Sequence, residues 1–132
     1  MVAQAVEKIK ALDSKFLRKD LPEINVGDSI KMKIKVKEAD KMRIHPFEGT
    51  IIKITGRGLK SAFTVRKISF GEGVERVFPI HSPVIESIQV ISHGVTKRAR
   101  LYYLRDRIGK KSRLRKDVPK EAAAAANPAV AA

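Results

Sequence analysis

The sequence predicts a small, mainly β protein, in which an antiparallel barrel or sandwich follows an N-terminal α-helix and precedes a basic C-terminal extension. Three observations support this fold class. Apolar residues recur with helical spacing at the start of the chain. Short segments rich in β-branched residues, separated by turn signals, follow. Ten Lys and Arg side chains then crowd residues 94–116. We expect a helix in residues 1–20, a barrel with its basic arm in 24–116, and a disordered alanine-rich tail in 117–132.

The N-terminal helix is predicted from a single apolar face. Its members are separated by three or four residues, which is the spacing of side chains on one side of an α-helix. They are Val2, Val6, Ile9, Leu12 and Phe16. Pro22 disfavours helical geometry at the residue before it, so the helix should end by that point.

A change of period from helical to alternating marks the first strand. In SIKMKIKVK, residues 29–37, apolar residues alternate with lysines, as in a strand with one buried face. Turn signals divide the following sequence into four further strands. They are FEGTIIKIT (47–55), AFTVRKI (62–68), VERVF (74–78) and VIESIQVI (84–91), the last ended by Gly94. The connections are EADKM, GRGLKS, GEG, and a bend between Pro79 and Pro83.

The composition points to a polyanionic partner. The 132 residues carry a net charge of +14, enough for one small domain with a strong positive field. Residues 94–132 hold 11 basic and 3 acidic groups, more than half of the surplus. Nucleic acid is the first candidate and an anionic membrane the second. Cysteine is absent, and neither a membrane span nor a secretory signal is recognisable, so we expect a soluble intracellular protein.

The basic arm is the main candidate for nucleic-acid contact. Arginines outnumber lysines six to four in it, and arginine is the better bidentate ligand of phosphate. Its cations are Lys97, Arg98, Arg100, Arg105, Arg107, Lys110, Lys111, Arg113, Arg115 and Lys116. Tyr102 and Tyr103 could stack on unpaired bases of folded RNA. If ARLYYL (99–104) is a strand, only one of the two tyrosines is free to do so. A solvated tail is the alternative, but the arm is more apolar than such a tail requires.

Further cations lie in the predicted barrel. Arg57 and Lys60 belong to the glycine-rich loop, which is either a phosphate contact or an ordinary hairpin loop. Arg66 and Lys67 are adjacent, so they point to opposite faces of their strand, and one of the two must meet solvent or a ligand. Which face Arg76 takes is left open in the same way. The alternating lysines of residues 31–37 are interpreted as a solubilising face.

Catalysis and metal binding find no support in the sequence. The three histidines, His45, His81 and His93, have no second histidine or cysteine at metal-ligand spacing. We expect His81 to be a structural hydrogen-bonding residue at the proline bend. No nucleophile motif is present, and we expect no enzyme activity, no cofactor and no metal.

Five motifs in order carry a family resemblance. They are FEGTII, GRG, FTVRKISFGEGVERVFPIHSP, IESIQV and RARLYYLRDRIGK. Together they resemble bacterial large-subunit ribosomal protein nineteen over about residues 5–115. The alanine-rich tail departs from that pattern.

The resemblance implies a fold and a role. The fold is an SH3-like β-barrel preceded by a helix. The role is a structural, non-catalytic component of the large ribosomal subunit, in the cytoplasm. The implied partners are large-subunit rRNA, small-subunit rRNA across inter-subunit bridges near the aminoacyl-tRNA site, and neighbouring large-subunit proteins, without a membrane or a small-molecule substrate. A free-standing DNA-binding architectural protein and a small RNA-modifying enzyme are the alternatives.

Overall fold

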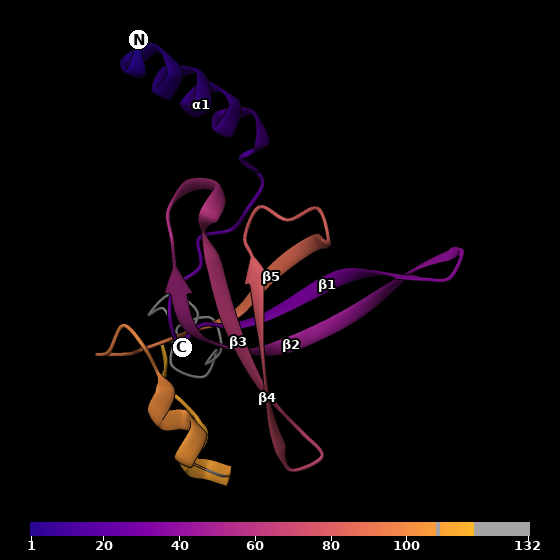
Figure 1. Ribbon diagram of the computed structural model, residues 1–132. Helices are drawn as coiled ribbons and strands as arrows, with labels where there is room; N and C mark the ends of the chain where they lie inside the picture. The colour runs from indigo at the N-terminus through magenta and orange to yellow at the C-terminus, as the bar shows by residue number, and fades with distance from the viewer. Residues whose placement is uncertain (108, 118–132) are drawn as a thin grey trace, which may run out of the picture.

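The computed structural model describes residues 1–107 and 109–117, which form one antiparallel sheet with a helix extending from it (Figure 1). The strand order is β4-β3-β2-β1-β5-β6. The elements are α1 (Val2–Phe16), β1 (Ser29–Glu38), β2 (Lys41–Thr55), β3 (Ala62–Ser69), β4 (Glu72–Pro79), β5 (Ile85–Gly94) and β6 (Lys116–Asp117). Three short 3₁₀ helices are η1 (Gly58–Lys60), η2 (Tyr102–Asp106) and η3 (Gly109–Ser112). The mainly β fold and the N-terminal helix are therefore confirmed.

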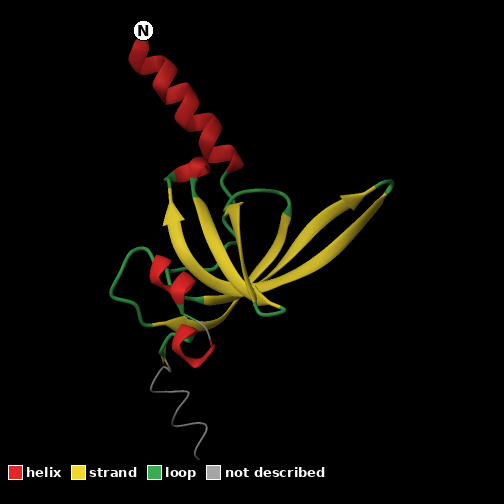
Figure 2. Ribbon diagram, turned by 60° about the horizontal axis from the view of Figure 1, so that its bottom comes forward, coloured by secondary structure: helices red, strands yellow, loops and turns green. Residues whose placement is uncertain are grey.

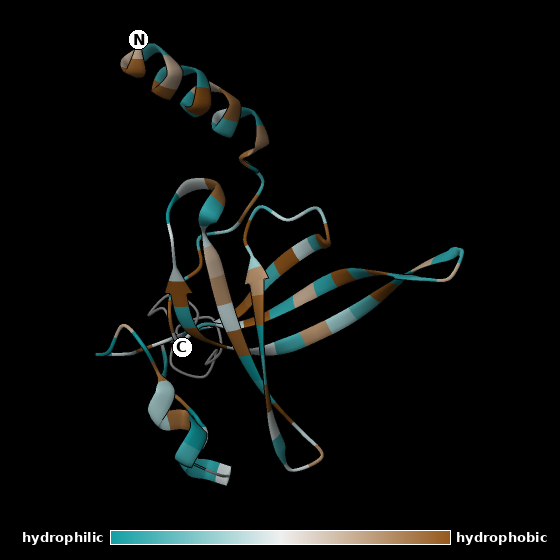
Figure 3. Ribbon diagram, in the orientation of Figure 1, coloured by the Kyte–Doolittle hydropathy of each residue, from teal (hydrophilic) through white to brown (hydrophobic). Residues whose placement is uncertain are grey.

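Helix α1 ends earlier than the sequence indicated. Leu17 already has extended backbone, because the next residue is held by the sheet. The Arg18 N–H donates to His81 Nδ1 at 3.1 Å, and the Arg18 guanidinium donates to the Ile85 carbonyl at 2.6 Å. His81 is thus the structural hydrogen-bonding residue that was predicted. No residue of α1 is buried, and Figure 3 shows brown apolar and teal hydrophilic positions mixed along its exposed length.

Strand β2 is longer than predicted, because it begins at Lys41 and includes Pro46. Proline lacks the N–H needed for a sheet with neighbours on both sides. β2 tolerates it because β3 pairs with β2 only from Thr50 onward, so that the segment before Thr50 pairs with β1 alone. The outer part of the β1–β2 hairpin accordingly extends away from the rest of the sheet (Figure 1).

One face of the sheet encloses the main core. The alternating residues Ile30, Met32 and Ile34 of β1 are buried, as their period predicted. They pack with Phe47, Ile51, Phe63, Val65, Phe78, Ile85 and Ile88 from the other strands. Irregular pairing between Ile51 and Lys53, and at two places between β1 and β5, allows the sheet to bend around these side chains. Figure 2 shows the resulting curvature.

The sheet is curled but not closed. Its edge strands β4 and β6 do not pair with each other in the part of the chain that the structure describes. The predicted barrel and its SH3-like character are therefore not confirmed. The observed sheet encloses its main core by curvature, without a complete ring of hydrogen bonds.

The arm differs from the prediction in two places. The segment 99–104, expected to be a strand, instead contributes its second half to η2, because a 3₁₀ turn places Leu101 and Leu104, three residues apart, on the same buried side. Strand β6, which pairs with the end of β5, was not predicted, since two residues are too short for a recognisable period. The tail prediction falls almost entirely on residues 118–132, outside the described residues.

Candidate nucleic-acid interface

A second apolar cluster fixes the arm to the sheet. Ile52 points away from the main core, and Leu101 and Leu104 of the arm are buried against it. Val26, Tyr103 and Leu114 pack around these three side chains. The Leu101 N–H donates to the Ile52 carbonyl at 2.9 Å, and the Val95 N–H donates to the Arg115 carbonyl at 2.9 Å. The arm is therefore fixed both near its start and near its end.

An ion-pair network adds a polar attachment between the arm and the β3–β4 hairpin. The Arg105 Nε and Nη2 atoms each donate to a different oxygen of Glu75 at 2.8 Å. Arg66 Nη1 also donates to Glu75, at 2.9 Å. The hydrogen bond from Arg105 above all holds the pKa of Glu75 below its ordinary value, and the same bond raises the pKa of Arg105. Both arginines therefore have a structural partner besides any ligand.

The two tyrosines lie against arginines of the arm. Arg98 and Arg107 lie over the Tyr103 ring at 5.1 and 4.8 Å from its centroid. Arg105 lies over the Tyr102 ring at 4.6 Å. Tyr103 is half-buried and Tyr102 is exposed, so one of the pair faces the apolar cluster, in a 3₁₀ helix instead of the expected strand. These cation–π contacts restrict the directions in which the arginines point.

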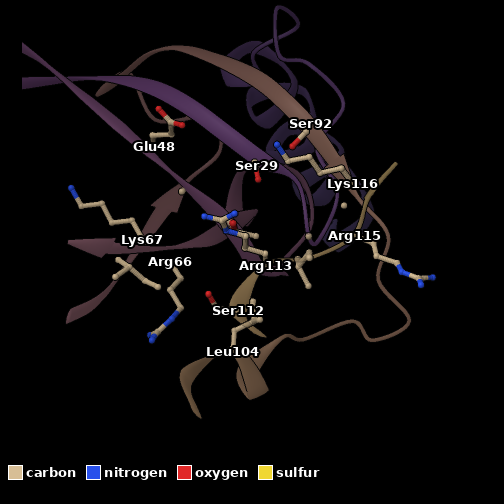
Figure 4. Close-up of a pocket in the computed structure, with 16 residues that line it drawn as sticks. Ser29, Glu48, Arg66, Lys67, Ser92, Leu104, Ser112, Arg113, Arg115 and Lys116 are labelled. Carbon is tan, nitrogen blue, oxygen red and sulfur yellow. The ribbon is translucent and has the colours of Figure 1, made fainter. Parts of the chain in front are cut away.

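A groove of about 680 Å³ lies between the arm and the outer face of β1, β2, β3 and β5. Its basic side chains come from β3 and from the end of the arm, and they are Arg66, Lys67, Arg113, Arg115 and Lys116. Glu48 is the one carboxylate among the lining residues. Figure 4 shows Arg113 near the middle of this set, with Lys67 and Arg115 on opposite sides of it. Cations gathered in this way attract a polyanion and repel one another without it.

The floor of the groove is a row of hydroxyl groups. Ser29 pairs with Ser92 of β5 on one side and with Thr50 of β2 on the other, and Thr50 pairs with Arg66 of β3. Residues paired directly across an antiparallel sheet share a face, so these side chains form one continuous line. Hydroxyls both donate and accept hydrogen bonds, so they suit phosphate and ribose oxygens. Sequence reasoning missed this row, because only the strand register brings it together.

The remaining predicted cations are distributed elsewhere. Arg57 directly precedes η1 and Lys60 is its last residue; both are exposed, and η1 contacts α1. Lys67, which also lines the groove, has its ammonium over the Phe47 ring at 4.6 Å from the centroid, and the Arg76 guanidinium lies over the same ring at 6.0 Å. Five other arm cations are exposed on the loop before η2 or on η3 and do not line the groove; they are Lys97, Arg98, Arg100, Lys110 and Lys111. The structure thus brings five of the predicted residues together in the groove and leaves the others around it.

The described residues contain neither a metal site nor a membrane-spanning helix. Among residues 1–107 and 109–117, no group of three or more His, Asp or Glu side chains is arranged to hold a metal ion. Within the same residues, no helix is long and apolar enough to cross a membrane.

The fold and the groove define a small, strongly basic β-sheet protein with cations arranged for a polyanionic partner. Comparison with known proteins gives the particular family. The family model described as Ribosomal protein L19 matches residues 7–117. The chain is also 53% identical over 102 residues to a protein of Alkaliphilus metalliredigens named "Large ribosomal subunit protein bL19", covering 77% of this chain and 87% of that protein.

The chain belongs to the ribosomal protein L19 family. It is therefore a structural constituent of the ribosome, located there in the bacterial cytoplasm, and not an enzyme. The resemblance stated from the motifs is confirmed by both comparisons.

Proposed function

We propose that the protein is a constituent of the large ribosomal subunit that binds large-subunit rRNA through the groove and the basic arm. The observation that carries this proposal is that basic residues from two distant parts of the chain, β3 and the end of the arm, line one groove with a floor of hydroxyl groups. Membership of a ribosomal family supplies the polyanion that such a surface requires.

The binding mechanism is electrostatic and geometric. The sheet is a rigid floor, and the Leu101 and Leu104 side chains hold the arm above it. Phosphates entering the groove neutralise the arm cations and release their condensed counterions. Arginines form paired hydrogen bonds to phosphate oxygens, while hydroxyls bond to phosphate or ribose. Because the cations come from both β3 and the arm, the groove can hold separate RNA segments together.

We extend the proposal to the placement that the family resemblance implied. The protein contributes to inter-subunit bridges near the aminoacyl-tRNA site, with small-subunit rRNA and neighbouring large-subunit proteins as partners. Helix α1 and the outer β1–β2 hairpin, which extend away from the core, are available for such contacts (Figure 1). The curled sheet is then an open variant of the SH3-like fold.

Salt dependence of RNA binding tests the proposal. Replacing Arg113, Arg115 and Lys116 with Gln should weaken binding to deproteinised large-subunit rRNA. It should also flatten the slope of log affinity against log salt by up to about two units, at about 0.7 per phosphate lost. Filter binding over a series of salt concentrations measures both quantities.

A matched control separates the groove from net charge. Replacing Lys33, Lys35 and Lys37 with Gln removes the same charge from the face interpreted as solubilising, and it should change the slope less. An equal effect of the two triple variants would contradict a role for the groove. Equal competition by duplex DNA of the same total charge would favour the architectural DNA-binding alternative.

A further inference from the structure

The tip of the β3–β4 hairpin carries a fully exposed aromatic side chain. Ser69 pairs with Glu72, so the connection has only two residues, Phe70 and Gly71. Phe70 has a relative exposure of 105%, the highest among the large apolar residues after Met1. The ring therefore contributes nothing to either apolar cluster of the sheet.

The backbone at this tip is unfavourable for phenylalanine. Phe70 and Gly71 have φ values of 52° and 83°, and a turn with two positive φ values is usually formed by Asn-Gly or Gly-Gly. A bulky residue in the left-handed region is a conformational outlier. Neither the exposure nor the backbone conformation of Phe70 stabilises the fold. Such outliers concentrate at functional sites, where another molecule uses the side chain.

The surroundings of Phe70 leave its ring open. A methyl group placed on Gly71 would meet no atom within 4 Å. Gly73 follows, with no side chain of its own. Glu72 is an exposed carboxylate, so the tip itself offers no net attraction for phosphate. A contribution of Phe70 to binding must therefore come from the flat apolar ring.

The tip continues the wall of the groove. Arg66, Lys67 and Ile68 of β3 line the groove, and Phe70 lies two residues beyond Ile68 in the same hairpin. Ile68 is itself 51% exposed. A strand of RNA whose phosphates occupy the groove would pass next to this tip. An unpaired nucleotide there would present a flat π-surface to the ring.

We propose that Phe70 is a stacking residue for an unpaired base of the RNA held in the groove. The inference rests on the proposed function and adds the kind of RNA that the site takes, which is single-stranded or bulged at the hairpin tip. Stacking on an aromatic ring tolerates any base, since every base has a π-face. The competing occupant is an apolar pocket of a neighbouring protein, which a leucine could also fill.

The chain contains no tryptophan, so a single substitution gives a direct reporter. The variant Phe70→Trp should fold normally, because the position is exposed. Its fluorescence should be quenched when deproteinised large-subunit rRNA binds, as a base stacks on the indole. The matched control Phe16→Trp, on exposed α1, should keep its emission. Unchanged emission from Phe70→Trp under saturating RNA would overturn the inference.

Affinity measurements on three variants provide the second test. Phe70→Leu should lower affinity for the same rRNA by about 5- to 150-fold, the range for one stacked base. Phe70→Tyr should keep near wild-type affinity, and Phe16→Leu should have little effect. If Phe70→Leu binds as tightly as wild type, stacking is refuted and the protein pocket becomes the better explanation.

The salt slope distinguishes this inference from the proposed function. Loss of stacking removes no phosphate contact, so Phe70→Leu should leave the slope unchanged while the triple groove variant flattens it. If wild-type affinity did not depend on salt, phosphate binding in the groove would be refuted, and the inference about Phe70 with it. If the groove variant flattened the slope while Phe70→Leu kept wild-type affinity, only the stacking role of Phe70 would be refuted.

Discussion

The variant Leu101→Ala should release the arm from the sheet. Leu101 is fully buried in a cluster that, among the residues the structure describes, has Ile52 and Leu104 as its other buried members. Truncating a buried leucine to alanine typically costs about 2–5 kcal/mol. The cluster lies outside the main core, so the cost falls mainly on local docking of the arm and not on global unfolding.

Hydrogen exchange measures this loss at individual amides. The Leu101 N–H connects the arm to Ile52 of β2, and the Val95 N–H, directly after β5, connects to Arg115 near the end of the arm; each bond breaks when the arm undocks. A cost of about 2 kcal/mol or more corresponds to exchange about 30-fold faster or more. Amides at the centre of β3 should change much less. The rRNA affinity should fall as well, because the groove cations of the arm lose their positions.

Leu12→Ala is the matched control, since Leu12 is 54% exposed on α1. It should change stability by no more than about 0.5 kcal/mol. Unaltered exchange at Leu101 and Val95 in the Leu101→Ala variant would refute the interpretation that the apolar cluster holds the arm in place.

Three other changes test separate parts of the structure. The pKa of Glu75 in the folded protein lies below its ordinary value of 4.5, so the ionised carboxylate stabilises the fold above the unfolded-state pKa, and this stability is lost as the pH falls through the folded-state pKa. The part of the acid destabilisation that is due to Glu75 should vanish in Glu75→Gln, as urea titrations at several pH values would show. The buried Asp28 carboxylate accepts hydrogen bonds from the Asn25 N–H at 2.8 Å and the Gly94 N–H at 3.3 Å. Asp28→Ala should therefore lower the free energy of unfolding in urea by about 1–3 kcal/mol, and a near-neutral result would contradict that role. Phe70→Asn should stabilise the free protein, by up to about 1 kcal/mol, because Asn-Gly suits the turn, and a clear loss of thermal stability would count against the proposed strain.

The strands were predictable where one face is buried. The alternation of Ile30, Met32 and Ile34 with lysines has a period of two, and only a strand can bury every second residue. The helix was predictable from its spacing in the same way, although its apolar face turned out to be exposed. Its early end was not, since Arg18 is held by His81, 63 residues away in sequence.

Tertiary contacts decided the features that were missed. The residues of 99–104 favour a strand by propensity, but burial of Leu101 and Leu104 on one side selects a 3₁₀ helix. Pro46 belongs to β2 because the segment before Thr50 pairs with β1 alone, which the sequence does not reveal.

The candidate site was predictable in charge but not in geometry. The excess of cations in the arm, together with Arg66 and Lys67, included the basic residues that line the groove. The register that aligns Ser92, Ser29 and Thr50 beneath them could not be read from the sequence. The sequence also does not reveal that Glu75 accepts hydrogen bonds from both Arg66 and Arg105.

Ultraviolet cross-linking within intact large ribosomal subunits tests the central claim most directly. Peptides that carry bound nucleotides would be identified by mass spectrometry after digestion of the RNA and protein. We predict cross-links from the end of the arm, around Arg113 and Lys116, and from β3 around Lys67 and Phe70. Cross-links confined to α1 or the outer β1–β2 hairpin, with none from the groove, would contradict the assignment of the groove as the rRNA-binding surface.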